Sequence, residues 1–381
     1  MKIGKILSCL LLGMAVAQAA QTTPENLSFK NELQASIDRG LEWLKVEQKT
    51  NGCWSSETLP ALTAMSLMCF KGDPAQKFAK NDASVLRIGY QYLLGMAKPD
   101  GGIYQTNYAT YNTALGMMAL LAANQPEFEP LILKARRYLI GLQNDLGEPG
   151  KIDTEMDGGI GYGSRYKHSD MGNTLYALEA IYYSRHLVTD KGTREPELNY
   201  RAAINFLQSC QNLPEVNHQA WVSEDPKDKG GFVYYPGSSM AGGVTNATTG
   251  KVSLRSYGSI SYAGMLSYLY ANLSKDDQRV KAVQQWLSNN YTLQENPGMG
   301  PEGLFFYFHT MTKALSAAEI KVLELQGGAK VDWRRDLARR LLDLQKRDGA
   351  WVNDTNRWME KDPVLTTAYT ILSLEIICRS L

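Results

Sequence analysis

The stretch NGCWSSETLPALTAMSLMCF, residues 51–70, begins with a glycine turn, continues through an aromatic residue and a polar loop, and ends in an apolar segment. The same order returns in DGGIYQTNYATYNTALGMMALLA, residues 100–122, and in DGAWVNDTNRWMEKDPVLTTAYTILSLEI, residues 348–376. Glycine ends helices and permits positive φ, so the aromatic residue after it can fold back onto the core of its repeat. One supersecondary unit therefore recurs from end to end of the chain.

About six such units cover the chain, and each places one helix before its turn and one after it. The first helix is amphipathic, as in residues 39–48 and 337–345, where charged and amide side chains lie opposite the apolar face. The second helix is apolar on most sides. It also carries small residues that let neighbouring helices approach closely: Ala61, Ala114, Ala177, Ala263, Gly264, Ala314 and Ala368.

Helix pairs of this kind form either an open solenoid with polar caps or a closed ring of inner helices inside outer ones. Apolar second helices occur even in the first and last units, which would be the exposed ends of a solenoid. A closed ring is favoured because it has no end to cap. We therefore expect one all-α domain, an (α/α)6 toroid over residues 37–377, after an N-terminal extension at residues 21–36.

The composition limits the classes of binding partner, and the N-terminal residues indicate the cellular compartment. The 381 residues include 40 Lys and Arg and 39 Asp and Glu, a net charge of +1, so no basic excess indicates nucleic acid. Residues 1–20 combine the basic MKIGK, the apolar ILSCLLLGMAVA and the small AQAA. This pattern predicts a signal peptide, and hence export to the periplasm or secretion. No later stretch reaches the roughly 18 apolar residues of a membrane span.

Four cysteines follow the predicted signal peptide: Cys53, Cys69, Cys210 and Cys378. Export permits disulfides, but these cysteines are scattered and form no CxxC pair. A free or buried thiol is the expectation for each of them.

Two stretches, RGLEWLKVEQKTNGCW (39–54) and ARRLLDLQKRDGAW (338–351), resemble the QW motif of squalene and oxidosqualene cyclases. That motif ends in Gln, a short spacer, Gly, any residue and Trp. These roles fall on Gln48, Gly52 and Trp54, and again on Gln345, Gly349 and Trp351. The GGF and GGI turns also resemble the repeats of protein prenyltransferase β-subunits. The resemblance covers residues 37–376 and implies an α/α toroid, but it is much less specific for an activity.

In this family the ligand site lies in the central cavity, near the amino ends of the inner helices. Unpaired backbone N–H groups and positive helix-dipole ends converge there. Aromatic faces lining a dry cavity suit apolar ligands and carbocations. The resemblance therefore implies an apolar, isoprenoid-type ligand as partner.

The resemblance also implies a catalytic motif. Class II terpene cyclases protonate an alkene with the middle Asp of a D-x-D-D cluster at the start of an inner helix. The nearest match is DMGNTLYALEAI (170–181), where Asp170 matches the first Asp, Gly172 stands at the donor position and Asn173 replaces the last Asp. The cluster is not intact, which puts standard protonation-initiated cyclisation in doubt. Asp170 is still favoured as an acid or a polar anchor.

His168, Tyr257 and His309 are the expected polar partners of Asp170. Simpler roles compete with these assignments. Asp170 directly precedes an inner helix and is equally suited to be its N-cap, and the same holds for Asp362. The remaining expected substrate-binding residues are Asp157, Tyr162, Asn173, Asn112, Arg255, Tyr262, Tyr307 and Asp362. Asp157 also fits an ordinary turn residue.

Protein prenyltransferases bind one zinc ion through Asp, Cys and His. His309 in FYFHTMTKALS resembles their His segment, but the sequence offers no assignable Asp and Cys partners. A hydrogen-bonded histidine at a helix start is the alternative for His309. We therefore predict no metal site and no cofactor. The GCGEQ stretch of complement-type thioester domains is absent from the sequence.

Carbohydrate-active toroids use paired carboxylates or a Tyr, His and Arg set, which Arg255, Tyr257, Tyr262 and His309 could imitate. The loop at residues 236–253 is rich in Gly, Ser and Thr and is either a lid over the cavity or a solvated surface insertion. Our main hypothesis is an exported toroid that binds, and in its sharper form transforms, an isoprenoid or other apolar ligand. Two alternatives stay open: a non-catalytic scaffold that holds a protein partner or envelope components, and a carbohydrate-active toroid.

Overall fold

A computed structural model describes residues 24–78, 83–163, 168–189 and 195–381. The fold is mostly helical, with 13 α-helices in these ranges, which confirms the predicted helical class. Two short antiparallel hairpins add to it: β1 (Gly243–Thr245) with β2 (Val252–Leu254), and β3 (Leu323–Glu324) with β4 (Lys330–Val331). No helix in the described ranges is both long and apolar enough to cross a membrane.

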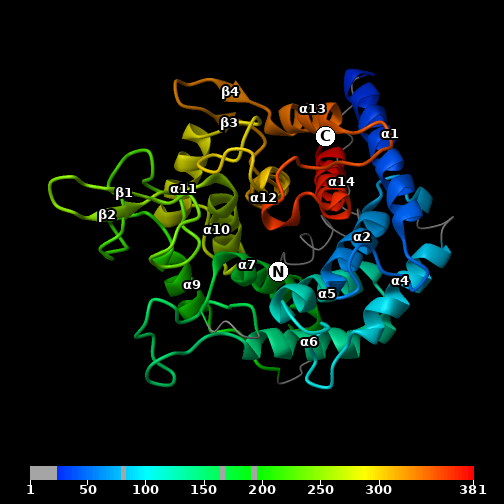
Figure 1. Ribbon diagram of the computed structural model, residues 1–381, viewed down its shortest axis with the longest axis horizontal. Helices are drawn as coiled ribbons and strands as arrows, with labels where there is room; N and C mark the ends of the chain where they lie inside the picture. The colour runs from blue at the N-terminus through cyan, green and yellow to red at the C-terminus, as the bar shows by residue number, and fades with distance from the viewer. Residues whose placement is uncertain (1–23, 79–82, 164–167, 190–194) are drawn as a thin grey trace.

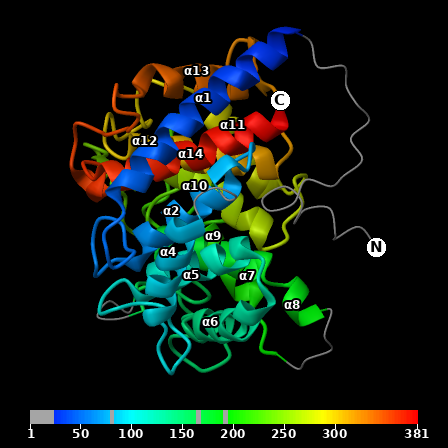
Figure 2. The same ribbon diagram turned by 90° about the vertical axis from the view of Figure 1, so that its right-hand side faces the viewer.

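Six helices form an inner layer and are buried on most sides: α2 (Pro60–Gly72), α5 (Ala109–Ala123), α7 (Met171–Tyr183), α10 (Gly258–Tyr270), α12 (Leu304–Ala317) and α14 (Pro363–Ser380). Each inner helix contacts the next along the chain, and α14 contacts α2. In Figure 1 these helices surround the centre of the molecule. In Figure 2, α14 runs from the left face of the molecule to the C-terminus at the right.

Six more helices lie outside the inner layer: α1 (Pro24–Glu47), α4 (Ala83–Gly95), α6 (Glu129–Gly141), α9 (Tyr200–Ser209), α11 (Gln278–Asn289) and α13 (Trp333–Leu344). The short helices η3 (Pro126–Phe128), α8 (His186–Thr189) and η4 (Arg357–Met359) lie in the connections. Helix α1 is continuous from Pro24 and buries Phe29 and Leu33, so much of the expected extension at residues 21–36 belongs to the first helix. The expected signal peptide lies outside the described residues.

The order that the first and last turns share has a physical explanation in two hydrogen bonds. The backbone N–H of Trp54 donates to Oγ1 of Thr63 in α2 over 3.1 Å, and its indole N–H donates to the carbonyl of Leu44 in α1 over 2.6 Å. Trp351 repeats both bonds with Thr367 in α14 and Leu341 in α13. The aromatic residue of the turn therefore fastens the two helices of its unit together.

A glutamine at the end of an outer helix then joins one unit to the next. Gln48 donates to the carbonyl of Gly52 in its own turn and to that of Val85 in α4. Two further glutamines make the same double contact: Gln143 reaches Gly158 and Asn199, and Gln211 reaches Gly230 and Arg279. Gln345 in the last unit donates to Gly349 and to Ser36 of α1, so the last outer helix is bonded to the first.

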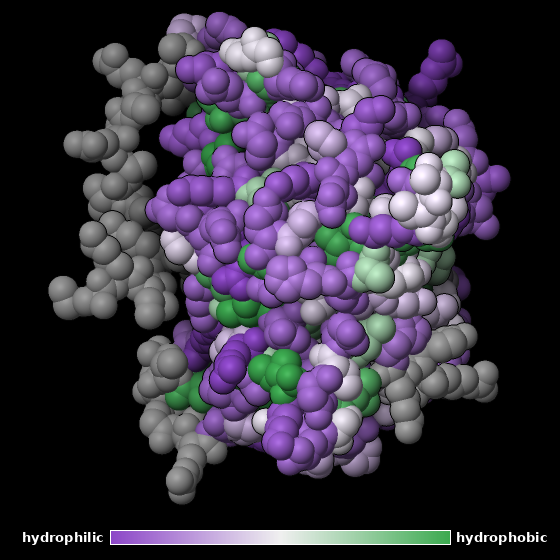
Figure 3. Space-filling view, turned by 90° about the vertical axis from the view of Figure 1, so that its left-hand side faces the viewer, coloured by the Kyte–Doolittle hydropathy of each residue, from purple (hydrophilic) through white to green (hydrophobic). Residues whose placement is uncertain are grey.

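The hairpin β1–β2 is the outer part of the loop at residues 236–253. It lies at the far left of Figure 1, outside the outer helices, and its strand residues are exposed or half-buried. The face that carries it is mostly hydrophilic, with small separated hydrophobic groups (Figure 3). The loop is therefore a surface insertion in this structure.

Candidate functional site

A cavity of about 290 Å³ opens at the amino ends of the inner helices. Each inner helix or the loop before it contributes to the wall. The lining residues are Leu59, Leu62, Tyr108, Tyr111, Tyr162, Asp170, Gly172, Asn173, Tyr176, Tyr234, Tyr257, Ser259, Ile260, Phe306, Trp358, Met359, Glu360, Leu365 and Tyr369. We call this space the amino-end cavity.

Four aromatic side chains form the floor of this cavity: Tyr111, Tyr176, Phe306 and Tyr369, here called the aromatic layer. The rings of Tyr111 and Tyr176 meet edge to face with centroids 4.9 Å apart, and the hydroxyls of Tyr176 and Tyr369 are 3.3 Å apart. Below Tyr369, the ring of His309 stacks at 4.9 Å and faces a different cavity. The expected single central cavity is thus divided into two cavities.

Bulky apolar residues in strained backbone conformations form the rim. Tyr108, Trp358 and Met359 have φ of 54°, 53° and 65°, a left-handed region that large side chains seldom adopt. Their side chains are 48%, 40% and 42% exposed, although each lines the cavity. Strain of this kind persists where the surroundings enforce it and gathers at ligand sites.

Asp170 is the N-cap of α7 and is fully buried. Its Oδ1 accepts from the backbone N–H of Asn173 over 2.9 Å, and its Oδ2 accepts from the side-chain amide of the same residue over 2.8 Å. Burial raises the pKa of Asp170, and hydrogen bonds from Asn173 and Tyr234 and the nearby His168 act against that rise. A carboxyl group in an aromatic cavity with a raised pKa can hold either a proton or a polar ligand atom.

Three tyrosines surround this carboxyl group. The hydroxyls of Tyr162 and Tyr234 are 2.9 Å apart. Burial, followed by the charge of Asp170, raises the pKa of both Tyr234 and Tyr257, so these phenols stay protonated. His168 lies just behind them, with its ring 4.9 Å from that of Tyr235. The structure therefore brings Asp170, Asn173, Tyr162, Tyr257 and His168 into one neighbourhood.

Gly172 also lines the cavity. A Cβ built there would meet only Asp170 Oδ1 at 3.3 Å and a Tyr234 ring carbon at 4.0 Å. The position that corresponds to the acid donor of the D-x-D-D motif thus faces open space and carries no functional group.

Glu360 is a second buried carboxyl group in the same cavity, and the sequence analysis missed it. Its Oε1 accepts from the backbone N–H of Phe306 over 2.8 Å, and its Oε2 accepts from Phe305 and from Asn353. Burial raises the pKa of Glu360, and these hydrogen bonds act against that rise. Glu360 precedes α14 in sequence but caps α12 in space, and nothing local in WMEKDP indicates that contact.

Other expected site residues have structural roles. Asn112 accepts from the N–H of Ala61 and so caps α2, while Asp362 caps α14 through the N–H of Val364. Asp157 accepts from the N–H groups of Leu146, Asp153 and Thr154, and these bonds hold its pKa below the ordinary value although burial opposes them. In this structure Asp362 is therefore an N-cap and Asp157 is a turn residue, as the simpler alternatives predicted.

The remaining expected residues lie away from the amino-end cavity. Tyr262 and Tyr307 pack against each other in the core, with ring centroids 5.6 Å apart, and Tyr307 donates to the carbonyl of Thr292. Arg255 is half-buried beside the hairpin and its backbone N–H donates to Gly242. His309 is inside α12, not at its start, and lines the cavity on the other side of the aromatic layer.

Histidine, cysteine and carboxylate side chains could form a metal site, and cysteines could form disulfides. Within the described ranges, no three His, Cys, Asp or Glu side chains gather as a metal ion would need. Cys53, Cys69, Cys210 and Cys378 are all buried free thiols. Burial raises the pKa of each of them, which disfavours the reactive thiolate.

No protein-family model and no curated protein sequence matches this chain. Solved structures do resemble it. A variant of the type II terpene cyclase MstE from Scytonema matches with a TM-score of 0.55 at 12% identity, over 93% of this chain and 99% of that chain. Another variant of that enzyme, in complex with its substrate geranylgeranyl dihydroxybenzoate, gives 0.54 at 12% identity, over 93% and 100%.

A protein from Salmonella enterica serovar Paratyphi A, described as a possible member of the GH105 family, matches with a TM-score of 0.53 at 11% identity, over 92% of this chain and 94% of that chain. At such identities the likeness establishes a fold of the α/α-toroid type. A shared fold does not fix an activity, which depends on the residues of the site.

Proposed function

We propose that this protein binds an isoprenoid, or a similarly apolar and unsaturated ligand, in the amino-end cavity. The observation that carries the proposal is the cavity wall: nine aromatic residues line one small cavity that also holds the buried carboxyl group of Asp170. Aromatic faces attract both alkenes and developing cations. The structural likeness to a cyclase that binds a geranylgeranyl substrate agrees with this ligand class.

Asp170 has two roles open to it at this site. As an anchor, its carboxylate accepts a hydrogen bond from a ligand hydroxyl beside Tyr162, Tyr234 and Tyr257. As an acid, its raised pKa keeps a proton available at a pH where an ordinary Asp has lost it. We favour the anchor, because both carboxyl oxygens already accept hydrogen bonds from Asn173, and such bonds stabilise the ionised form.

The proposal includes the architecture and the compartment. We infer that residues 37–377 lie within one (α/α)6 toroid, supported by the contact between α14 and α2 and by the bond from Gln345 to Ser36. We also infer export after removal of residues 1–20, supported by their basic, apolar and small-residue pattern. N-terminal sequencing of the protein from a periplasmic or culture fraction tests the export, and an intact residue 1 there would contradict it.

Two measurements test the ligand. Mass spectrometry of an organic extract from the purified protein should reveal a co-purified lipid, and geranylgeraniol should quench the fluorescence of Trp358 at the rim. Leu62→Phe, which narrows the amino-end cavity, should weaken that quenching. An extract without lipid, together with no response to geranylgeraniol up to its solubility limit, would refute the proposal.

One observation supports a carbohydrate ligand as the second candidate. Asp170 and Glu360 are two buried carboxyl groups on the wall of one cavity, which is the functional-group set of a glycoside hydrolase. The likeness to the possible GH105 member agrees with it. Oligosaccharide binding that is lost in both Asp170→Asn and Glu360→Gln, with no response to geranylgeraniol, would favour this candidate over the first.

A further inference from the structure

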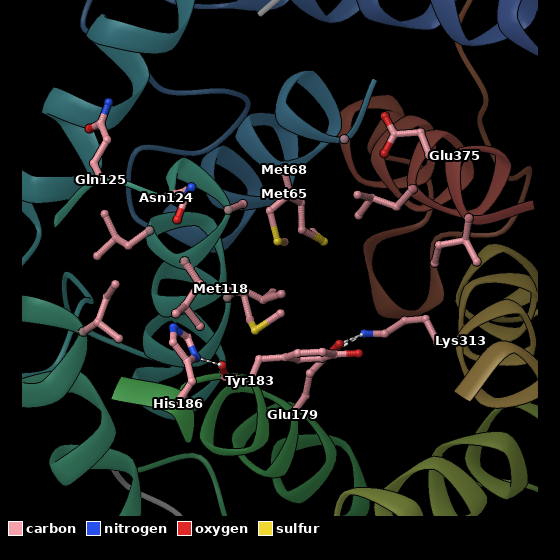
Figure 4. A pocket seen from close by; sticks show the side chains of 18 of the residues that line it. Met65, Met68, Met118, Asn124, Gln125, Glu179, Tyr183, His186, Lys313 and Glu375 are labelled. Atoms are coloured by element: carbon pink, nitrogen blue, oxygen red, sulfur yellow. Dashed lines mark hydrogen bonds and ion pairs between the residues drawn. The ribbon is translucent and has the colours of Figure 1, made fainter. Parts of the chain in front are cut away.

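A second cavity, of about 330 Å³, opens at the carboxyl ends of the inner helices, and we call it the carboxyl-end cavity. It shares no lining residue with the amino-end cavity. The helical period explains the separation: Leu62 of α2 faces one cavity and Met65, one turn later, faces the other. Figure 4 shows its wall from close by.

One side of this cavity is apolar and adaptable. Met65 and Met68 of α2 and Met118 of α5 point into it together (Figure 4), with Leu115 and Leu372 beside them. Methionine is unbranched and polarisable, so a wall of methionines can adjust to chains of different shape. This wall suits an apolar body.

The opposite side holds a buried ion pair. Lys313 of α12 pairs with Glu179 of α7, and Tyr270 donates a hydrogen bond to the same carboxylate over 3.3 Å. The two side chains are 10% and 3% exposed. Since each charge is matched by the other, the pair leaves no net charge for a ligand to neutralise, and a charged ligand would have to bury an uncompensated charge.

Two polar atoms on this wall have no partner. His309 is 5% exposed, and its Nδ1 makes no hydrogen bond. Burial lowers the pKa of His309 well below its ordinary value, and Lys313 lowers it further, so the ring is neutral, while the backbone of Tyr369 acts to raise the pKa, as a carbonyl acceptor does. We therefore assign the ring proton to the nitrogen on the Tyr369 side and the acceptor role to Nδ1. Oε1 of Glu375, a residue that is 1% exposed, is also unpartnered. A buried polar atom without a partner has lost its hydrogen bonds to water, and a ligand group that bonds to it recovers that loss.

We propose that the carboxyl-end cavity is a second binding site, specific for a neutral apolar molecule with one hydroxyl group. The apolar body lies against Met65, Met68 and Met118, and the hydroxyl donates to His309 Nδ1. An ether or an ester in place of the hydroxyl cannot donate and leaves that acceptor unpaired. A carboxylate has the same defect and adds a net negative charge to a wall on which Glu179 is already paired with Lys313 and Glu375 with Arg379. This site does not depend on the ligand proposed for the amino-end cavity.

The test uses 1-decanol and its methyl ether as probes, with 10-bromodecanol to locate the site. Titration calorimetry should show that the wild-type protein binds decanol about tenfold more tightly than the ether, the factor expected for one hydrogen bond of about 1.4 kcal/mol. In His309→Phe, which keeps an aromatic ring on Tyr369, the two probes should bind equally. Decanoate should bind more weakly than decanol.

A matched pair of variants on α2 separates the two cavities. Met65→Phe narrows the carboxyl-end cavity and should weaken decanol binding at least tenfold, whereas Leu62→Phe narrows the amino-end cavity and should leave it within twofold. Both residues are 1% exposed, so the two substitutions carry similar packing costs. A crystal grown with 10-bromodecanol gives the position of the bromine directly and needs no variant.

Any of three results would overturn the proposal: bromine in the amino-end cavity or in neither, an ether that binds as tightly as the alcohol, or decanol binding that Leu62→Phe weakens and Met65→Phe does not. Failure of the first proposal gives a different pattern, since the response to geranylgeraniol that Leu62→Phe weakens would be absent while the decanol results stand.

Discussion

Asp170 and Asp362 occupy the same local position but different surroundings. Each is the N-cap of an inner helix and accepts a hydrogen bond from a backbone N–H in the first turn. Asp170 is fully buried on the wall of the amino-end cavity, whereas Asp362 is half-buried, bonds to Ser55 and does not line it. The pair therefore separates the structural role of a capping Asp from any role in binding.

The first prediction uses this pair. Asp170→Ala and Asp362→Ala should each lower the free energy of unfolding, by about 0.5–2 kcal/mol for the lost cap, measured by urea denaturation. Only Asp170→Ala should also weaken binding of geranylgeraniol, measured by fluorescence titration. Equal losses of binding in both variants would mean that the effect comes from helix α7 and α14 fraying and not from the carboxyl group of Asp170.

The second prediction concerns two buried glutamates. Burial raises the pKa of Glu375 well above its ordinary 4.5, while Arg379 lowers it and Asp73 raises it further. Because the folded-state pKa is the higher one, the protonated form stabilises the fold, and that stability is lost as pH rises from about 4.5 through the folded-state pKa. Glu375→Gln should therefore reduce the fall in stability between pH 4.5 and neutrality, measured by urea denaturation across that range.

Glu360 provides the contrast. Its carboxyl oxygens accept hydrogen bonds from Phe305, Phe306 and Asn353, and a glutamine there has one acceptor atom in place of two. Glu360→Gln should lose about 1–3 kcal/mol of stability at neutral pH, although the pKa of Glu360 is raised as well. If Glu375→Gln and Glu360→Gln changed the free energy of unfolding in the same direction at neutral pH, Glu375 Oε1 would not be the unpartnered atom described above.

At the scale of elements, much of the fold was readable from the sequence. The Gln, Gly and Trp of residues 48–54 and 345–351 predicted the turn between outer and inner helix, and both turns have that structure. What the sequence did not indicate is where each Gln side chain reaches. Val85 and Ser36 are the second partners of Gln48 and Gln345, and they lie 37 and 309 residues away. Such contacts depend on how the helices pack.

The third prediction tests how closely these turns pack on the next outer helix. Gly349 has φ of 100°, and a Cβ there would lie 2.5 Å from the carbonyl oxygen of Arg39 in α1. Gly237 has φ of 84°, but a Cβ there would meet nothing within 4 Å. Both Ala substitutions carry the cost of positive φ, and only Gly349→Ala adds a clash with backbone that cannot move freely.

Gly349→Ala should therefore destabilise the protein by clearly more than Gly237→Ala, whose expected cost is about 1 kcal/mol. Thermal and urea denaturation of both variants give the comparison. Equal destabilisation would show that the turn of the last unit does not press against α1.

At the scale of the whole molecule, the division of the central space was beyond reach of the sequence. Periodicity predicted the apolar inner helices. It gave no axial register between helices, and so could not show that Tyr111, Tyr176, Phe306 and Tyr369 meet at one level. The same limit explains why His309 was grouped with Asp170, although the aromatic layer lies between the cavities they line.

Closure of the helix array has a consequence for the chain ends. Arg334 at the start of α13 donates to the carbonyl of Ser380 over 2.9 Å, and its neighbour Arg335 bonds to Asn26. Two adjacent side chains thus contact both ends of the described chain. In a closed ring the first and last units pack against each other as any other two neighbouring units do. In an open array they are the two exposed ends of the structure.

The fourth prediction follows from that equivalence. A circular permutant should join residue 381 to residue 24 through about six Gly and Ser residues, which span roughly 13 Å on average. Its new ends lie between Thr248 and Thr249, at the exposed tip of the β1–β2 hairpin. It should unfold in one cooperative transition, with a free energy of unfolding within about 2 kcal/mol of that of the linear protein of residues 24–381.

A second permutant, opened at the exposed Gly150, should behave in the same way. If both unfolded in two separate steps, the last and first units would not hold together as the bond from Gln345 to Ser36 requires.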